Sequence, residues 1–373
     1  MSGGVDSSVT AAMLVRAGHD VLGCFMRLGS PGETLDELAP ADACDAAPAA
    51  SKIGHQGCCS ITDAADARLV AAHLGIPLYV CNFKKEFGRI IDYFVGEYAD
   101  GRTPNPCVRC NDWLKFGKLR EYAAQVGATA VASGHYARVR EGRLLRGVDV
   151  SKDQSYVLFG MPREQIGHTM FPVGDLPKAH VRALAKEWGL PVFDKPDSQE
   201  ICFVPDQDYA ALVERHRPDL ARPGPITDTS GRSLGRHDGQ HRYTIGQRRG
   251  LPLAVGRPLY VVARRAATNT VVVGERRDVQ VGACIVGEAN FLADMPATEF
   301  RALAQFRAHG VAVPGRVRRV DDTAGPTPSG RRGRFEVSFD QPQDAVAPGQ
   351  ALVLYDAVAP DAVVGGGWIE SAS

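Results

Sequence analysis

Several features are scarce or missing in this 373-residue sequence, and each absence excludes a class of protein. Lys+Arg and Asp+Glu both number 43, so the chain has no net charge and is not a uniformly basic nucleic-acid binder. No apolar run comes near the roughly 20 residues that span a bilayer, and no basic-then-apolar signal opens the chain. The sequence therefore predicts a cytoplasmic protein without a membrane partner.

Cationic residues are unevenly spread along this neutral chain. Lysine does not occur after Lys195, so arginine supplies every later long cationic side chain. Residues 231–257 contain six arginines and one acidic residue, and residues 301–340 contain eight arginines and four acidic residues. The first stretch also carries side chains that can stack on unpaired bases, namely His237, His241 and Tyr243. Because RNA binding needs local positive charge, the first stretch predicts an RNA-binding face; for the second, a solvated ionic face is an equal alternative.

The nine cysteines are an odd number and do not suggest a disulfide framework in a chain without an export signal. Reduced, reactive or metal-binding thiols are expected instead. Cys24 and Cys81 lie in apolar, strand-like runs, where they are expected to be small buried hydrophobes. Cys58 and Cys59 are adjacent, and packing is favoured over metal binding there.

Strands and helices alternate over the first 204 residues. Helical patterns cover residues 7–17, 62–74, 86–98, 112–126 and 177–188, and strand patterns cover residues 20–28, 77–83 and 129–133. A polar stretch over residues 29–57 indicates a long loop, and Glu141-Gly142 indicates a hairpin turn. This alternation predicts a doubly wound parallel α/β sheet.

The pattern changes after about residue 204, where prolines punctuate a linker-like stretch followed by short, Gly-rich strands. From about residue 279 only short alternating β segments follow, as in residues 334–339 and 351–355. We therefore expect an α/β domain over residues 1–204, a small central α+β domain over 205–278 and a C-terminal β-barrel over 279–373.

The most specific motif opens the chain: Ser2-Gly3-Gly4-Val5-Asp6-Ser7-Ser8. Two glycines allow a tight turn whose N–H groups point inward, and the helix that follows directs its positive end to the same place. The string therefore predicts a pyrophosphate-binding loop, with a glycine turn and a helix cap as the structural alternative. It is not a Walker A loop, because the Gly-Lys-Ser/Thr ending is missing.

Two further strings place cysteines in polar surroundings. Residues 101–111 read Gly-Arg-Thr-Pro-Asn-Pro-Cys-Val-Arg-Cys-Asn. We expect Cys110 at the start of the following helix, where the helix dipole lowers a thiol pKa, although a lone CxxC can also bind zinc. The other string is Asp197-Ser198-Gln199-Glu200-Ile201-Cys202-Phe203. Its polar residues favour a reactive site at Cys202 over a core position.

The opening string resembles the PP-loop ATP pyrophosphatases, which split ATP between its α and β phosphates. Together with the thiol strings, residues 133–136, 151–156, 243–251 and 348–350 resemble the tRNA 2-thiouridylase family over nearly the whole chain. The resemblance implies an ATP-dependent sulfurtransferase that makes 2-thiouridine at the wobble uridine 34 of Lys, Glu and Gln tRNAs. It also implies a sulfur donor such as a cysteine desulfurase or a relay protein.

The resemblance assigns roles residue by residue. Positions that match the family's ATP-binding residues are Ser2, Gly3, Gly4, Val5, Asp6, Ser7, Ser8, Met26 and Gly134. Met26 would pack on the adenine, Gly134 would line the nucleotide site, and Asp6 is a candidate ligand of Mg²⁺. Positions that match tRNA contacts are Asn105, Pro106, Cys107, His135, Lys152, Asp153, Gln154, Gln305, Phe306 and Gln350.

Cys110 matches the family's nucleophile and Cys202 its persulfide carrier. The implied reaction adenylates uracil O2, transfers sulfur from Cys202 and leaves a disulfide between the two cysteines. Some members carry aspartate where this chain has Cys107, so a general-base role does not carry over to this thiol, and we expect Cys107 to have an auxiliary catalytic role. An Arg-Tyr pair of the family is Gln305-Phe306 here, which shifts the phosphate-binding cation to Arg307.

Three alternatives stay open at this point. Cys107, Cys110 and Cys202 can instead be three ligands of a [4Fe–4S] cluster. The chain can be another PP-loop ligase or amidotransferase that acts on a small molecule, or an RNA-binding protein without catalysis.

The family's fold places a central strand of about five or six residues directly before the phosphate loop. Only Met1 precedes Ser2 in this sequence. We therefore expect the natural chain to begin upstream of Met1, and an in-frame stop codon just before it would exclude this expectation.

Overall fold

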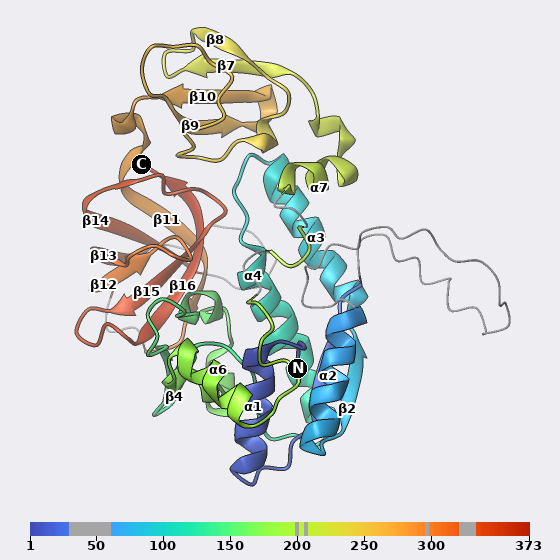
Figure 1. Cartoon of the computed structure of the whole chain (residues 1–373). Helices are drawn as coiled ribbons and strands as arrows, with labels where there is room; N and C mark the ends of the chain where they lie inside the picture. The colour runs from blue at the N-terminus through green and yellow to red at the C-terminus, as the bar shows by residue number, and fades with distance from the viewer. Residues whose placement is uncertain (30–60, 198–200, 205–207, 295–297, 321–332) are drawn as a thin grey trace, which may run out of the picture. The chain divides into compact units, whose positions relative to one another are not determined.

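The computed structural model describes residues 1–29, 61–197, 201–204, 208–294, 298–320 and 333–373 (Figure 1). Outside them fall residues 30–57 of the expected loop, Cys58 and Cys59, and residues 198–200 of the Cys202 string. The described residues form two compact units: Met1–Phe87 with Ala179–Asp208, and Gly88–Lys178 with Tyr209–Ser373. None of the described helices is long and apolar enough to cross a membrane.

The first unit contains a pair of parallel strands and three of the predicted helices. Its elements are α1 (Val5–Arg16), β1 (Gly23–Arg27), α2 (Ile61–Leu74), β2 (Leu78–Asn82) and nearly all of α6 (Lys178–Glu187). β1 and β2 pair in parallel, with Met26 opposite Cys81. α1 buries Val9 and Ala12 completely, because small and branched side chains fill one side of the helix. The predicted alternation of helices and strands is confirmed here.

The helix α3 (Lys84–Ala99) follows from the spacing of its large apolar side chains. Phe87, Ile90, Phe94 and Tyr98 recur every three or four residues, and all are buried. This spacing places them on one stripe of the helix, so the predicted helix is confirmed with slightly longer ends.

One continuous helical segment carries both cysteines of the CxxC string. It consists of α4 (Pro106–Arg109), the π-helix η2 (Cys110–Lys118) and α5 (Leu119–Gln125). Asn105 caps this segment by accepting the N–H of Val108 at 3.3 Å, and Pro106 occupies the first turn. The segment therefore begins earlier than predicted. The expected position of Cys110 at the helix start is wrong, because Asn105-Pro106 starts the helix one turn before it.

The second unit also holds short strands of the α/β region. β3 (Val131–Ala132) pairs in parallel with β6 (Thr169–Met170), and β4 (Ala137–Arg140) forms a hairpin with β5 (Arg143–Arg146). The hairpin turn is the predicted Glu141-Gly142, and both residues have positive φ values of 51° and 71°. Single turns of 3₁₀ helix follow at η3 (Ser155–Leu158), η4 (Arg163–His168) and η5 (Pro172–Asp175).

A small sheet follows the α/β region. β7 (Gly224–Asp228), β8 (Ser233–His237), β9 (Tyr260–Arg265) and β10 (Thr270–Gly274) pair in the order β8-β7-β10-β9. Ile226, Val261 and Val271 are fully buried and form the core of this sheet. The helix α7 (Tyr209–His216) precedes it, in a stretch that the prolines had suggested was a linker. The expected α+β composition is confirmed.

The C-terminal strands close into a barrel in the order β11-β14-β13-β12-β15-β16 (Figure 1). They are β11 (Gln280–Phe291), β12 (Glu299–Gln305), β13 (Val313–Val320), β14 (Arg334–Asp344), β15 (Ala351–Asp356) and β16 (Val363–Ala372). In β14 buried Phe335, Val337 and Phe339 alternate with more exposed positions, as a strand between core and solvent requires. The predicted β-barrel is confirmed.

Candidate active site

The opening string forms a glycine turn at the start of α1. Gly3 has φ 69°, and a Cβ at this position would lie 2.3 Å from the carbonyl oxygen of Asp63. Only glycine satisfies both conditions. The Oγ atoms of Ser2 and Ser7 lie 3.2 Å apart, and the Ser8 hydroxyl donates to the Gly4 carbonyl at 2.8 Å. The turn thus gathers hydroxyls at the N-terminus of a 12-residue helix, a suitable place for a phosphate.

Lys195 contacts this loop and was not among the residues predicted from the sequence. Its Nζ atom donates to the Gly3 carbonyl at 3.0 Å and contacts carboxylate oxygens of Asp63 and Asp66, each at 2.6 Å. Burial lowers the pKa of Lys195, but the two carboxylates raise it more, so its net pKa lies above the ordinary value and the ammonium stays charged. Its signal in the sequence was its place as the last lysine of the chain.

The two other predicted ATP-binding residues lie on separate elements. Met26 is half-buried on β1 in the first unit, and Gly134 lies in the turn after β3 in the second. Their joint role at a nucleotide stays a prediction.

Cys202 lies half-buried in the first unit, just after the residues outside the described range. Its neighbour Phe203 is buried and meets Phe87 edge-to-face, with ring centres 5.5 Å apart. Upstream, Asp197 accepts from Arg182 at 2.6 Å. These contacts fix both sides of the Cys202 segment to the first unit.

The two cysteines of the CxxC string differ in exposure. Cys107 lies in the first helical turn and is exposed, whereas Cys110 is half-buried where the π-helix begins. Asn111 donates its side-chain amide to the Cys107 carbonyl at 3.0 Å. Short π-helical stretches are frequent at functional sites, because they change which side chains share a helix face. Burial raises the pKa of Cys24 and of Cys284 to about 12.

His135 lies buried beside the helix that carries Cys107 and Cys110. Its Nδ1 is 2.6 Å from the Ser133 hydroxyl, and its Nε2 is 3.5 Å from the Lys115 ammonium on η2. Burial first, and the Lys115 charge second, hold the His135 pKa well below its ordinary value. The imidazole is therefore neutral near pH 7 and accepts from Lys115.

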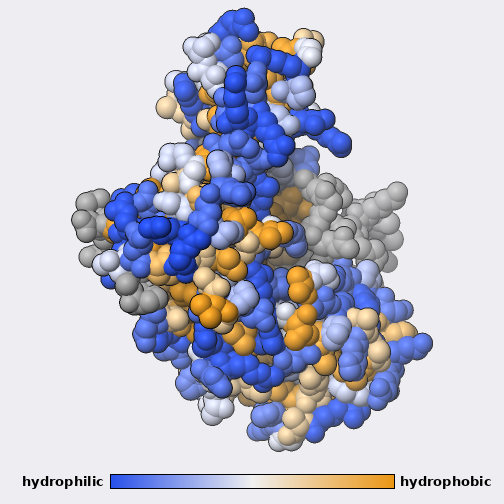
Figure 2. Space-filling model, turned by 90° about the vertical axis from the view of Figure 1, so that its left-hand side faces the viewer, coloured by the Kyte–Doolittle hydropathy of each residue, from blue (hydrophilic) through white to orange (hydrophobic). Residues whose placement is uncertain are grey.

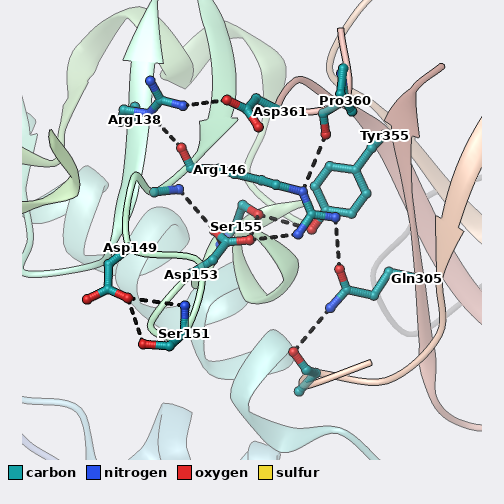
Figure 3. A network of polar contacts seen from close by, with 12 residues as sticks. Arg138, Arg146, Asp149, Ser151, Asp153, Ser155, Gln305, Tyr355, Pro360 and Asp361 are labelled. Carbon is teal, nitrogen blue, oxygen red and sulfur yellow. Dashed lines mark hydrogen bonds and ion pairs between the residues drawn. The ribbon is translucent and has the colours of Figure 1, made fainter. Parts of the chain in front are cut away.

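Two predicted tRNA contacts, Asp153 and Gln305, take part in one polar network (Figure 3). Asp153 accepts from Arg146 at 3.0 Å, and Gln305 on β12 accepts from the same guanidinium at 3.1 Å. The Arg146 guanidinium stacks 3.6 Å from the centre of the Tyr355 ring. Gln154 accepts the N–H of Tyr136 at 3.0 Å. Asp153, Gln154 and Gln305 thus form hydrogen bonds with other residues of the protein. Lys152, the neighbour of Asp153 in the sequence, is half-buried.

The remaining predicted tRNA contacts also lie on the barrel. Phe306 is nearly buried, packs on Phe339 and lines a cavity of about 320 Å³ together with Arg307. Arg307 donates to the Asp344 carbonyl at 2.6 Å. Gln350 donates its amide to the carbonyls of the CxxC loop, those of Thr103 and Pro104 at 3.2 and 3.1 Å.

The arginine-rich stretch over residues 231–257 differs from its prediction in the exposure of its aromatic side chains. His237, His241 and Tyr243 are buried, with exposed fractions of 1, 0 and 7%, so their predicted stacking on bases is wrong. Tyr243 belongs to the apolar core of the sheet, whereas the His237 ring lies 3.1 Å from the Asn269 carbonyl and the His241 ring 2.8 Å from Glu214. Exposed arginines without an ion-pair partner among the described residues remain there, namely Arg236, Arg248 and Arg249.

The arginines of the barrel are mostly paired. Arg301, Arg316 and Arg318 each lie within 2.8 Å of a carboxylate on another strand of the barrel. On the face turned to the viewer in Figure 2, hydrophilic side chains predominate, with hydrophobic ones in small groups between them. The second arginine stretch is therefore a solvated ionic face in these residues.

Neither compact unit contains, among its described residues, a group of three or more His, Cys, Asp or Glu side chains that could hold a metal ion. Cys107 and Cys110 belong to one unit and Cys202 to the other. Within one unit the donor set does not fit a [4Fe–4S] cluster, which takes three or four ligands. The single carboxylate of Asp6, in the first turn of α1, fits Mg²⁺ that is held mainly by phosphates.

Comparison with protein-family models matches nearly the whole chain. Residues 1–206 match the tRNA methyl transferase HUP domain, residues 211–275 the tRNA methyl transferase PRC-barrel domain, and residues 281–369 the aminomethyltransferase beta-barrel domain. These matches agree with the α/β region, the small central sheet and the closed barrel.

Several curated proteins of similar sequence carry the name tRNA-specific 2-thiouridylase MnmA. The protein of Geotalea uraniireducens (strain Rf4) is 44% identical over 385 residues, covering 100% of this chain and 94% of the relative. The protein of Solibacter usitatus (strain Ellin6076) is 45% identical, covering 99% and 98%. That of Roseiflexus castenholzii (strain DSM 13941 / HLO8) is 44% identical, covering 99% and 97%.

Proposed function

Since the chain belongs to the tRNA-specific 2-thiouridylase family of tRNA sulfurtransferases, we propose that it converts a uridine of tRNA into 2-thiouridine in a reaction that consumes ATP. The observation that carries this proposal is the match to such proteins over nearly the whole chain. The domain models carry a methyl-transfer description, but a methyl transfer requires neither a pyrophosphate loop nor a reactive cysteine pair. The phosphate loop and the thiol-bearing helix therefore favour thiolation.

The proposed substrate is the wobble uridine 34 of Lys, Glu and Gln tRNAs, following the resemblance of the sequence strings. Exposed Arg236, Arg248 and Arg249 on the central sheet support RNA binding, because unpaired guanidiniums remain available to phosphates. The base must leave its stack to reach the thiols. Asn105 and Pro106, which fix the start of the thiol helix, are proposed to receive it.

The first step activates the uracil C2–O2 bond. Oxygen is a poor leaving group, so O2 attacks the α phosphorus of ATP, pyrophosphate leaves, and O2 now carries AMP. The glycine turn before α1 holds the phosphates, and Lys195 supplies a positive charge beside Gly3. Mg²⁺, with Asp6 as its protein ligand, neutralises phosphate charge when bound.

The second step replaces oxygen by sulfur. A donor protein first loads Cys202 with a terminal sulfur as a persulfide. The terminal sulfur attacks C2 and AMP leaves with its electron pair on O2. The Cys110 thiolate then attacks the Sγ of Cys202, which breaks the bond to the transferred sulfur and leaves 2-thiouridine and a Cys110–Cys202 disulfide. An external dithiol, such as that of a donor protein, reduces the disulfide for the next turnover.

His135 is proposed to contribute as a neutral hydrogen-bonding group. Its imidazole faces Lys115, and its buried position keeps it uncharged near pH 7. The Lys115 ammonium beside it belongs to the same helix as Cys110. The pair therefore places a positive charge on the thiol helix without a competing imidazolium.

An assay with unmodified tRNA, ATP, Mg²⁺ and a persulfide donor, such as a cysteine desulfurase with cysteine, tests the function, with nucleoside mass spectrometry as the readout. We expect 2-thiouridine together with stoichiometric AMP and pyrophosphate. RNA binding without any of these products would favour the non-catalytic alternative. ATP cleavage that does not depend on tRNA would favour a small-molecule ligase or amidotransferase. Iron analysis of anaerobically purified protein separates the two sulfur chemistries, since active iron-free protein excludes the cluster.

A further inference from the structure

Arg109, between the two cysteines of the CxxC string, is buried in an aromatic cage. Its side chain is only 2% exposed, and its guanidinium carbon lies 3.9 Å from the centre of the Trp368 ring. The rings of Trp113 and Tyr93 follow at 5.0 Å each. A buried cation is costly unless a charged partner and hydrogen bonds compensate it. Arg109 therefore needs a specific partner to stay where it is.

That partner is Glu288 on the barrel strand β11. The two guanidinium nitrogens donate to the two carboxylate oxygens at 2.9 and 2.8 Å, a bidentate pair. Burial lowers the pKa of Arg109 but Glu288 raises it more, so the cation stays charged. The pair joins a thiol-bearing helix to a strand 179 residues later in the sequence.

The backbone at Glu288 is strained. Its φ is 49°, in the left-handed region that favours glycine, and the pairing of β11 with β16 shifts register between Gly287 and Asn290. A bulge of this kind redirects a side chain away from the regular strand pattern. A glutamate in a conformation that suits glycine is strained, and its bidentate pair with Arg109 offsets this strain.

The barrel also holds the other end of the CxxC loop. The Thr103 N–H donates to the Pro348 carbonyl at 2.8 Å, and the Gln350 amide donates to Thr103 and Pro104. By contrast, α5, at the far end of the same helical segment, has no buried residue. The segment is therefore fixed at its cysteine end, and the barrel supplies the contacts that fix it.

We propose that Arg109 and Glu288 are positioning residues, through which the barrel sets the orientation of the helical turn that carries Cys107 and Cys110. This inference rests on the proposed function insofar as Cys110 is its nucleophile. The pair does not touch the reacting atoms. It fixes the helix frame directly before the π-helix, so that the Cys110 thiol meets the substrate at one distance and angle.

The test compares Glu288→Gln and Glu288→Gly with the wild-type protein. Glu288→Gln removes the charge, and Glu288→Gly also relieves the strained backbone, which helps the variant to fold. We expect kcat for thiolation to fall by about 100-fold, as for a reacting group misplaced by about 1 Å, with the KM values for tRNA and ATP within about twofold. Glu299→Gln is the matched control, because Glu299 pairs with Arg316 on the surface of the same barrel.

A second measurement does not require thiolation. Iodoacetamide labelling at one fixed pH, mapped by peptide mass spectrometry, gives the ratio of the Cys107 and Cys110 alkylation rates. We expect this ratio to change at least about fivefold in both Glu288 variants and to stay unchanged in Glu299→Gln. A folded Glu288→Gly protein with wild-type kcat and a wild-type ratio would overturn the proposal. If even the wild-type protein makes no 2-thiouridine, the proposed function fails, while the labelling ratio still decides the positioning role.

Discussion

The phosphate loop and the thiol-bearing helix acquire their shapes in different ways. The loop is built by neighbours in sequence: Gly3 takes a left-handed conformation, and the hydroxyls of Ser7 and Ser8 both donate to the Gly4 carbonyl. The thiol helix is held by residues far away in the chain, Glu288 and Gln350 of the barrel. The conformation of a local site follows from a short string of residues, whereas the conformation of a site held at long range does not.

Lys195 is the exception on the side of the loop. It lies 192 residues from Gly3 in sequence and yet donates to its carbonyl, while also neutralising Asp63 and Asp66. The loop's backbone is thus a local structure, but its electrostatic environment is not. The predictions below separate these contributions.

The largest effect is expected at Cys110 and Cys202, the two cysteines proposed to react. Cys110→Ala and Cys202→Ala should each lower 2-thiouridine formation by at least about 1,000-fold, because each thiol takes part in bond making that no neighbour replaces. ATP binding, measured by calorimetry, should be unchanged. Cys284→Ala serves as the control, since Cys284 is buried in the barrel core. A fully active Cys202→Ala enzyme would refute the persulfide route.

Removal of the long-range charge at the loop should have the next largest effect. In Lys195→Met, Asp63 and Asp66 lose their cation and repel the triphosphate, so the Kd for ATP should rise by about 10- to 100-fold. Lys186→Met removes an exposed lysine of α6 and should leave the Kd unchanged. Titration calorimetry with Mg-ATP measures both variants. An unaltered Kd in Lys195→Met would show that the loop binds ATP without a contribution from the Lys195 charge.

The buried imidazole of His135 should make stability depend on pH. Its folded-state pKa lies below the ordinary 6.5, so the unfolded chain binds the proton more readily, and stability is lost as the pH falls below 6.5. Wild-type protein should lose up to about 1.4 kcal/mol of unfolding free energy per pH unit more than His135→Gln does. Urea denaturation between pH 5.5 and 7.5 measures the difference, in which His237 and His241 cancel because both proteins contain them. If the unfolding free energies of wild type and His135→Gln change equally with pH, the lowered pKa of His135 is contradicted.

The smallest effect is expected at the exposed arginines of the central sheet. Arg248→Ala and Arg249→Ala should each weaken tRNA binding by about three- to fivefold and reduce the slope of log K against log salt by about one phosphate contact. Arg318→Ala on the barrel should have less effect, because Arg318 is paired with Glu336. Fluorescence anisotropy at several salt concentrations measures all three variants. Equal losses for barrel and central-sheet arginines would mean that tRNA contacts both faces.

Local patterns accounted for much of the fold. The pattern over residues 86–98 predicted the helix α3, Glu141-Gly142 predicted the hairpin turn, and alternation in β14 predicted a barrel strand. Prediction failed where two local signals competed. Prolines masked α7, and Asn105-Pro106 started the thiol helix at residue 106, before the predicted start at residue 112.

The candidate site shows the same division at the level of single residues. Ser2 to Ser8 could be predicted because the turn, the hydroxyls and the helix start lie within seven positions. His237, His241 and Tyr243 were expected on the surface, and only the packing of the central sheet shows that they are buried. Arg146, which joins Asp153 to Gln305, had no signal in the sequence at all (Figure 3).

The sequence by itself determined the phosphate loop, the succession of helices and strands, and the two thiol strings, because each depends on backbone preferences and on contacts between near neighbours. Only the tertiary structure decided that Glu288 compensates Arg109, that Lys195 lies at Gly3 and that Gln350 holds the CxxC loop. Burial and charge compensation depend on which distant side chains meet, and no local pattern contains that information.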